Sequence, residues 1–185
     1  DNVDSTNLNR QYLYNDCDIS KSKVDVVEQK IKLKNPSAIV KSYNMFVKNY
    51  DEIENIIKKE HIDIVICAAD TPFLDIRIFI LEACISCKVP CIFGGVSILT
   101  GQYGPTFLNS KKMSLYLKKL NKIKKEVKCN NTNKSSFGPT NTIISAYMSI
   151  DIIMTLLNIR KSINSLNKIK TLNFITRKDY EEERF

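Results

Sequence analysis

The sequence has 185 residues, of which 43% are hydrophobic and 26% charged, and its formal net charge is +8 at pH 7. These values are typical of a globular protein and exclude the disordered and fibrous classes. No apolar run approaches the roughly 20 residues that a membrane-spanning helix needs, which excludes a transmembrane protein. The sequence does not begin with Met and shows no signal-peptide pattern, so we expect it to be part of a longer chain.

Helical and strand patterns alternate along the chain. Helices are predicted where apolar residues recur every three or four positions: over 20–33, 50–60, 72–87, 111–128 and 138–157. Strands are predicted in short β-branched or aromatic runs: over 38–40, 62–67, 89–93 and 170–176, with a strand-and-turn region over 96–108. The continuous run over 62–67 is typical of a strand buried on both faces of a parallel sheet. This alternation predicts an α/β fold with a doubly wound, mainly parallel, Rossmann-like sheet in a single domain over 1–185.

The positive charge is concentrated in one lysine-rich segment, 111–134. It holds nine lysines against one acid, Glu126, so the rest of the chain is formally neutral. Such a segment could bind nucleic acid by neutralising phosphates. However, lysine (23) far outnumbers arginine (5), so bidentate readers of phosphate and bases are scarce. Leu117, Leu120, Ile123 and Val127 recur at helical spacing, which predicts a surface insert or crossover helix whose lysines face solvent, and disfavours nucleic acid as a partner.

The cysteines and the single histidine argue against a metal site and against catalysis by a histidine base. Cys84 and Cys87 form one C-x-x-C without a second pair or a nearby histidine, whereas a structural zinc site needs four ligands. We therefore expect buried thiols at the end of a helix, no zinc, and a reducing compartment, either the cytoplasm or an organelle. His61 has no partner placed by sequence and is expected at a loop edge.

Several separated motifs occur in a fixed order. Ser5-Thr6-Asn7-Leu8-Asn9-Arg10-Gln11 precedes Asp18-Ile19-Ser20-Lys21-Ser22-Lys23 and Asn35-Pro36; Asp63–Asp70, Glu82-Ala83-Cys84, Gly94-Gly95 and Gly138-Pro139 follow. This order resembles the ThiF/MoeB/HesA family of ubiquitin-activating-enzyme-like adenylyltransferases, with its S-N-L-x-R-Q, D-I-G-x-x-K and N-P patterns. The resemblance covers nearly the whole chain except the lysine-rich segment. At Asp70-Thr71-Pro72-Phe73 the chain looks more like the branch that adenylates a peptide antibiotic.

The resemblance implies ATP-dependent adenylation of the C-terminal carboxylate of a ubiquitin-like or sulfur-carrier protein, or of a peptide. Arg10 and Lys23 would stabilise the phosphates as the carboxylate attacks, and Asp70, at the end of a strand, would bind Mg²⁺. The ATP-binding residues implied by the resemblance are Thr6, Asn7, Leu8, Asn9, Arg10, Gln11, Lys23, Asp70 and Thr71. A homodimer or a related partner subunit is also implied, and no membrane partner.

Two departures from the family pattern limit these expectations. The family's G-x-G-G-x-G loop and its ribose-binding acid would precede Asp1, which itself resembles the second acid of the D-x-D pattern. We therefore expect the domain to be N-terminally incomplete. The family's zinc-binding C-x-x-C is absent after Gly104-Pro105. The alternative interpretation is a non-catalytic pseudoenzyme, or the partner subunit of a heterodimeric activating enzyme.

Cys129 is a candidate nucleophile. It lies nine residues before Gly138, where the resemblance implies a loop whose cysteine takes the acyl group from the adenylate. Lys124, Lys125 and Lys128 would favour the thiolate over the thiol. An ordinary exposed thiol beside a lysine-rich run is the alternative.

Overall fold

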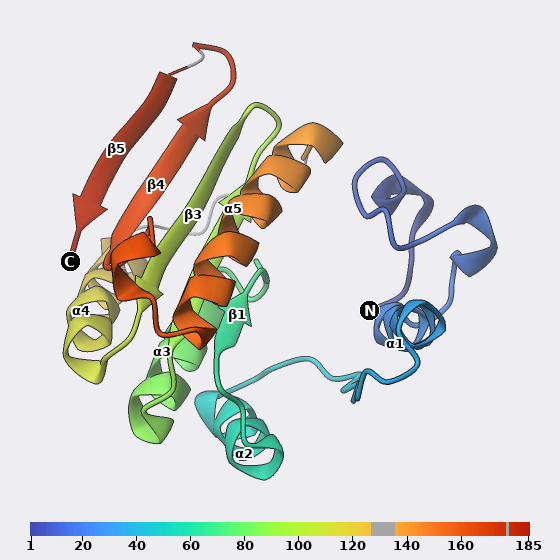
Figure 1. The fold of residues 1–185 in the computed structure, drawn as a ribbon, viewed down its shortest axis with the longest axis horizontal. Coiled ribbons are helices and arrows are strands. Elements are labelled where there is room, and N and C mark those ends of the chain that lie inside the picture. The colour runs from blue at the N-terminus through green and yellow to red at the C-terminus, as the bar shows by residue number, and fades with distance from the viewer. Residues whose placement is uncertain (127–135, 177) are drawn as a thin grey trace. The chain divides into compact units, whose positions relative to one another are not determined.

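The computed structural model describes residues 1–126, 136–176 and 178–185, with backbone only for 178–183 (Figure 1). Its contacts divide the chain into two compact units. The first comprises Asp1–Phe46 with Phe137–Pro139, and the second comprises Val47–Ser136 with Thr140–Phe185. The predicted single domain over 1–185 stays a prediction.

The first unit is built from the short 3₁₀ helices η1 (Ser5–Asn7) and η2 (Asp16–Asp18) and the helix α1 (Lys23–Lys34). The first residues of the chain lie beside the segment that enters α1, since the Val3 N–H donates to the Lys21 carbonyl at 2.9 Å. The helix predicted over 20–33 is thus confirmed in type and begins slightly later than predicted.

Asp18 ties η2 to α1. Its carboxylate accepts the backbone N–H of Asn15 at 2.9 Å and forms ion pairs with Lys30 and, at 3.7 Å, with Lys21. The hydrogen bond from Lys30 is the main cause that lowers the pKa of Asp18, and burial only partly opposes it. A charged carboxylate therefore fixes the turn that precedes α1.

The strand predicted over 38–40 is wrong. These residues form no strand, and Ile39 is 90% exposed. A strand satisfies its backbone groups only by pairing with another strand. None of the described residues pairs with this segment in a ladder.

The second unit contains a five-stranded sheet in the order β1-β2-β3-β4-β5. The strands are β1 (Val65–Cys67), β2 (Cys91–Val96), β3 (Thr100–Phe107), β4 (Lys168–Asn173) and β5 (Lys178–Arg184). Only β1 and β2 are parallel, joined through a crossover helix, and every other pair is antiparallel. The prediction of a mainly parallel sheet is therefore wrong for the described residues. The physical reason is that β2–β3 and β4–β5 are joined by short turns, which connect antiparallel strands.

Both ends of the sheet differ from the sequence prediction. The run over 62–67 yields a strand of only three residues, and Ile66 within it is 48% exposed, so burial on both faces is wrong. At the other edge, β5 forms within a charged tail for which no strand was predicted. Its acidic and basic residues have low strand propensity, but the turn after β4 brings its backbone alongside that strand.

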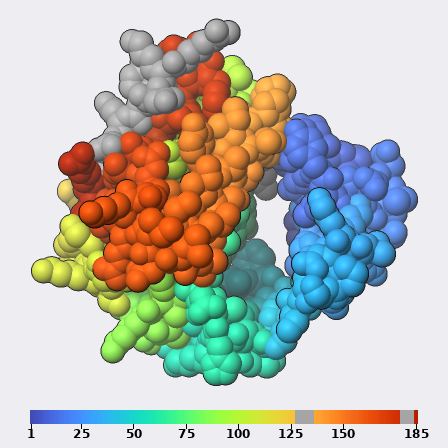
Figure 2. Space-filling view, in the orientation of Figure 1, coloured from blue at the N-terminus to red at the C-terminus, as the bar shows by residue number. Residues whose placement is uncertain are grey.

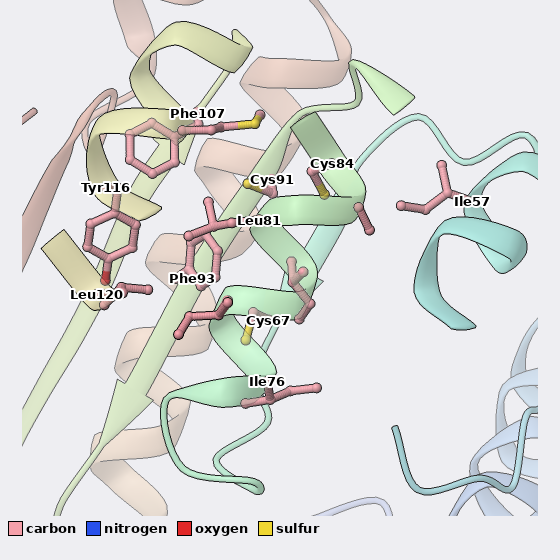
Figure 3. Close-up of a cluster of buried hydrophobic side chains, with 14 residues drawn as sticks. Ile57, Cys67, Ile76, Leu81, Cys84, Cys91, Phe93, Phe107, Tyr116 and Leu120 are labelled. Carbon is pink, nitrogen blue, oxygen red and sulfur yellow. The ribbon is translucent and has the colours of Figure 1, made fainter. Parts of the chain in front are cut away.

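Helices cover both faces of the sheet (Figure 1). On one face lie α2 (Tyr50–Glu60), α3 (Asp75–Cys87) and α4 (Ser110–Glu126), and on the other lies α5 (Gly138–Leu156), whose outer surface is visible in Figure 2. Successive residues of β2 point to opposite faces. Phe93 packs with the α3–α4 cluster of Figure 3, whereas Ile92 packs with α5. None of the described helices is long and apolar enough to cross a membrane.

The lysine-rich segment forms the surface helix α4. Tyr116 and Leu120 are buried against the sheet and α3, and Lys118, Lys122 and Lys125 are exposed. The part of the segment that contains Lys128 and Lys134 lies outside the described residues.

A buried carboxylate connects α5 to the approach to β4. Asp151, 1% exposed, accepts the N–H of Asn164 at 2.8 Å, and the N–H and hydroxyl of Ser165 at 2.9 and 2.6 Å. The Ser165 hydroxyl is also 2.7 Å from that of Thr106 in β3. Because buried charge is costly unless donors surround it, this network fixes the segment relative to β3 and α5.

We expect Leu81→Ala to lower the free energy of unfolding by about 2–5 kcal/mol, since Leu81 is fully buried in α3 and its truncation leaves a cavity. Leu33→Ala, at a position 82% exposed, should change it by no more than about 0.5 kcal/mol. Urea unfolding of both variants measures the difference, and equal losses would contradict the assigned core.

Candidate functional site

A capping box shapes the segment that carries most of the predicted site residues. The Asp4 carboxylate accepts the Thr6 N–H at 2.8 Å and the Thr6 hydroxyl at 2.6 Å. In return, the side-chain oxygen of Asn7 accepts the Asp4 N–H at 3.0 Å. The hydroxyl of Thr6 is the main cause that lowers the pKa of Asp4, followed by its N–H, and the charge of Lys23 contributes. Asp4 and the 7% exposed Asn7 therefore hold the backbone of η1 in place.

Arg10 carries a charge that is bound only to neutral oxygens. One terminal nitrogen, Nη1, donates to the Thr6 carbonyl at 2.7 Å and to the Asn9 side-chain oxygen at 2.9 Å. Among the described residues no carboxylate forms an ion pair with Arg10. The guanidinium is thus oriented while its charge remains available to an anion.

Lys23 begins α1 and lies against the first residue of the chain. Its ammonium is 2.6 Å from an Asp1 carboxylate oxygen, and its side chain is 20% exposed. Its backbone N–H also donates to the Asp1 carbonyl at 2.9 Å. The cation therefore sits at a helix N-terminus, where backbone N–H groups add positive potential, and it already has an acidic partner.

Gln11 has an unused acceptor. Its side-chain oxygen Oε1 is buried and has no hydrogen-bond partner among the described residues. Buried polar atoms are nearly always satisfied, so this oxygen lacks the donor that such atoms normally have. Leu8 is half-buried and Asn9 is exposed beside it.

Gly138 makes a close approach that only glycine allows. A Cβ built there would lie 2.7 Å from the Asn9 carbonyl oxygen and 2.4 Å from the Tyr12 hydroxyl. Since the carbonyl belongs to the backbone, it could not give way without moving the segment that carries Arg10. The Gly138-Pro139 pair belongs to the family pattern, and this close approach is a physical reason for the glycine.

Ser20 stands where the D-I-G-x-x-K pattern has glycine, and its φ is 70°. This left-handed conformation costs a residue with a side chain about 1–2 kcal/mol, which glycine avoids. Ser20 also donates its N–H to the Val3 carbonyl at 2.8 Å. The turn therefore requires the left-handed backbone conformation that glycine adopts readily, although this chain has serine at the position.

Asp70 and Thr71 follow the carboxyl end of β1 in the second unit. Asp70 is exposed, and its Oδ1 accepts the Thr71 hydroxyl at 3.1 Å. Mg²⁺ is commonly held by one or two carboxylates together with substrate phosphates and waters. Asp70 therefore fits the role of a single oxygen ligand. No cluster of three or more His, Cys, Asp or Glu side chains suited to a metal occurs within the described ranges.

The predicted site residues divide between the two units. Thr6 to Gln11 and Lys23 lie together in the first, and Asp70 and Thr71 lie in the second. Cys129 lies outside the described residues. The roles assigned to all of these residues stay predictions.

Arg77 was missed by sequence analysis because nothing in its motif marks it. Its Nη2 donates to the Gly94 carbonyl at 2.9 Å, and its guanidinium carbon is 5.6 Å from the ring centre of Phe93. It therefore links α3 to the end of β2 next to the Gly94-Gly95 motif.

The family profile described as ThiF family matches residues 1–184. The match covers almost the entire chain, and the chain belongs to the ThiF family.

Two curated relatives carry the name probable molybdopterin-synthase adenylyltransferase. The protein from Gracilaria tenuistipitata var. liui is 33% identical over 166 residues, which is 86% of this chain and 43% of the relative. The protein from Pyropia yezoensis is 28% identical over 94% of this chain and 47% of the relative. The chain therefore spans less than half the length of both relatives.

Solved structures share the fold. The crystal structure of E. coli MccB with ATP has a TM-score of 0.76 and 22% identity, covering all of this chain and 54% of MccB. The structure of PaaA has a TM-score of 0.76 and 20% identity, with 54% of that chain covered. At these identities the comparison supports the fold alone.

We expect Ser20→Gly to stabilise the first unit by about 1 kcal/mol, because it removes the left-handed strain of a residue with a Cβ. Ser22→Gly, at the N-cap of α1 where φ is −58°, is the matched control and should give no such gain. Thermal and urea unfolding compare the two variants. A loss of stability in Ser20→Gly would contradict the strain.

Proposed function

We propose that this chain is part of an ATP-dependent adenylyltransferase that joins AMP to the C-terminal carboxylate of a small carrier protein or peptide. The observation that carries the proposal is the charge of Arg10, oriented by the Thr6 carbonyl and Asn9 and bound to no carboxylate among the described residues. Membership of the ThiF family and the names of the relatives support the same reaction class.

The chemistry requires positive charge near the phosphates. The carrier carboxylate attacks the α-phosphorus of ATP, a new C–O–P bond forms, and pyrophosphate leaves with the electrons of the broken P–O bond. Two anions must meet, so cations that are already oriented lower the barrier. Arg10 would contact the phosphates directly, and Lys23 would contribute from the N-terminus of α1 while Asp1 holds its ammonium.

Asp70 is the proposed ligand of Mg²⁺. When bound, Mg²⁺ would neutralise phosphate charge during the departure of pyrophosphate. The exposed Asp70 carboxylate would bind it through an oxygen, and Thr71 would orient that carboxylate through the hydrogen bond to Oδ1.

The carrier is proposed from the relatives. Two relatives are named for molybdopterin synthase, and MccB has been crystallised with MccA variants. We therefore propose either a small carrier protein or a short peptide with a free C-terminal carboxylate. A homodimer or a pairing with a related subunit remains part of the proposal.

We expect Arg10→Ala and Lys23→Ala in the full-length protein to reduce adenylation by about 10²-fold or more, as loss of an oriented charge stabiliser does. Asp70→Asn should remove most activity together with its dependence on Mg²⁺. Carrier-dependent exchange of labelled pyrophosphate into ATP measures all three variants.

Matched controls are available for each charge. Lys34→Ala removes an exposed lysine from the same helix as Lys23, and Asp63→Asn removes an exposed carboxylate close to Asp70 in sequence. Both should exchange like the unaltered protein. If the Arg10, Lys23 and Asp70 variants also do so, the assigned site is wrong. If the unaltered protein shows no pyrophosphate exchange with any carrier tested, a partner-subunit role would be supported instead.

We expect Cys129→Ser to abolish a thiol-sensitive conjugate with the carrier, if the thiolate attacks the acyl-adenylate and displaces AMP. Incubation with ATP and carrier, followed by mass spectrometry with and without reductant, detects the conjugate. Cys17→Ser, at an exposed position in the first unit, is the control. A conjugate that survives Cys129→Ser would contradict this nucleophile and leave the proposed adenylation intact.

A further inference from the structure

Strand β1 leaves the sheet before its neighbour β2 ends. The last pair between the two strands is Cys67 with Phe93, both labelled in Figure 3, and β2 continues beyond it. Every second carbonyl of a strand points to the same neighbour. Because the Val65 N–H donates to the Pro90 carbonyl at 2.9 Å, the next carbonyls on that side belong to residue 92 and then to Gly94. Gly94 is therefore the first residue of β2 whose carbonyl faces β1 without a partner in that strand.

Arg77 of α3 occupies the place that β1 leaves. Its Nη2 donates to the Gly94 carbonyl at 2.9 Å, and its guanidinium carbon is 5.6 Å from the ring centre of Phe93. A Cβ built at Gly95 would lie 3.2 Å from the same nitrogen, so the glycine leaves room for the guanidinium. A charged side-chain donor thus ends the β1–β2 ladder in place of a backbone N–H, and such bonds are stronger than neutral ones.

The charge of Arg77 is not neutralised by a carboxylate. Its side chain is half-buried, and among the described residues no aspartate or glutamate forms an ion pair with it. Its charge also opposes the rise in the pKa of Cys67 that burial causes. The guanidinium therefore lies close to the end of β1 as well as to the end of β2.

The chain that leaves β1 leads directly to Asp70. The Cys67 thiol lies 3.8 Å from the carbonyl oxygen of Ala69, and the exposed Asp70 follows. Because Arg77 satisfies the Gly94 carbonyl, residues 68–70 do not have to pair with β2. Ligands of open α/β sheets bind outside the carboxyl ends of the strands, where neighbouring strands diverge. Arg77 therefore supports the divergence at which Asp70 lies.

The connection from Asp70 to α3 contains a strained residue. Leu74, directly before α3, has a φ of 60°, and a residue with a Cβ keeps such a conformation only where surrounding contacts hold it. Two contacts hold the first turn of α3. Arg77 joins it to β2, and Asp75 forms an ion pair with Lys124 of α4. The bond from Arg77 thereby fixes the span that the connection from Asp70 has to cross.

We propose that Arg77 is a positioning residue for Asp70. By bonding to β2 where β1 ends, it keeps the connection over 68–74 out of the sheet and places the Asp70 carboxylate at the carboxyl ends of β1 and β2. It acts through the backbone and touches no substrate. The role of the positioned carboxylate, binding of Mg²⁺, rests on the proposed function, whereas its placement requires no metal.

Hydrogen exchange measures the placement without activity. In the full-length protein, free of nucleotide and metal, Arg77→Met keeps an apolar stem but removes the donors. Amide exchange in peptides covering 67–75 and 93–97 should become about 10-fold faster, the effect of losing one hydrogen bond from a charged donor. Lys124→Ala is the matched control, because it removes the ion pair to the same turn of α3 and keeps the bond to Gly94. It should leave exchange over 93–97 unchanged.

The Mg²⁺ dependence of carrier-dependent pyrophosphate–ATP exchange measures the consequence. Arg77→Met should raise the Mg²⁺ concentration for half-maximal exchange by about 10-fold, as loss of support around a metal ligand does. A variant that is only less stable would have a lower maximal rate and an unchanged Mg²⁺ midpoint. Arg77→Lys keeps a charged donor, so both of its readouts should lie between those of Arg77→Met and the unaltered protein.

Either of two results would overturn the proposal. In the first, hydrogen exchange over 67–75 is the same in Arg77→Met as in the unaltered protein. In the second, it becomes faster while the Mg²⁺ midpoint stays in place, which would make Arg77 a structural link only. If the unaltered protein shows no pyrophosphate exchange with any carrier, the proposed function fails separately, and hydrogen exchange still decides whether Arg77 places Asp70.

Discussion

The second unit depends on the buried negative charge of Asp151. A carboxylate inside a protein is tolerated only when donors surround it, and here the donors all come from the segment that enters β4. The hydroxyl of Ser165, which donates to Asp151, also lies within hydrogen-bonding distance of the Thr106 hydroxyl in β3. One side chain of α5 thereby fixes the segment from which β4 begins to pair. Removing its partners would leave an unpaired charge in the interior, which is among the costliest changes a core can suffer.

In the first unit, some polar side chains stabilise the backbone of the loop, and others carry a charge that could bind a ligand. Asp4 and Asn7 use their polar atoms on each other's backbone and on Thr6, so they build the turn. Arg10 is held by neutral oxygens and keeps its charge for an anion. Lys23 is different, since Asp1 already pairs with it. A phosphate that approached Lys23 would have to share its ammonium with the Asp1 carboxylate.

The local sequence pattern predicted the helices well, because apolar residues at helical spacing lie on the side of a helix that faces the core. The helix over 50–60 was predicted with the bounds that α2 has. Strand direction was not predictable in the same way, since it depends on which strands meet. The segment around Ile39 has strand-like residues but no partner strand, and β5 has a partner but no strand-like residues. In the candidate site, the motif singled out Arg10 and Asp70, whose roles stay predictions. It could not show that Asn7 points inward or that Gly138 touches Asn9, because both depend on contacts between separate segments.

The order of the strands has a consequence for how the second unit folds. β2 and β3 are neighbours along the chain, as are β4 and β5, so each pair can form as a local hairpin. Joining them through β3 and β4 instead closes the long connection from Leu108 to Asn167, which contains α4 and α5. The entropy lost in closing a loop grows with its length, and distant pairings slow folding. We therefore expect the two hairpins to form early and the β3–β4 seam to limit the rate at which the sheet becomes continuous.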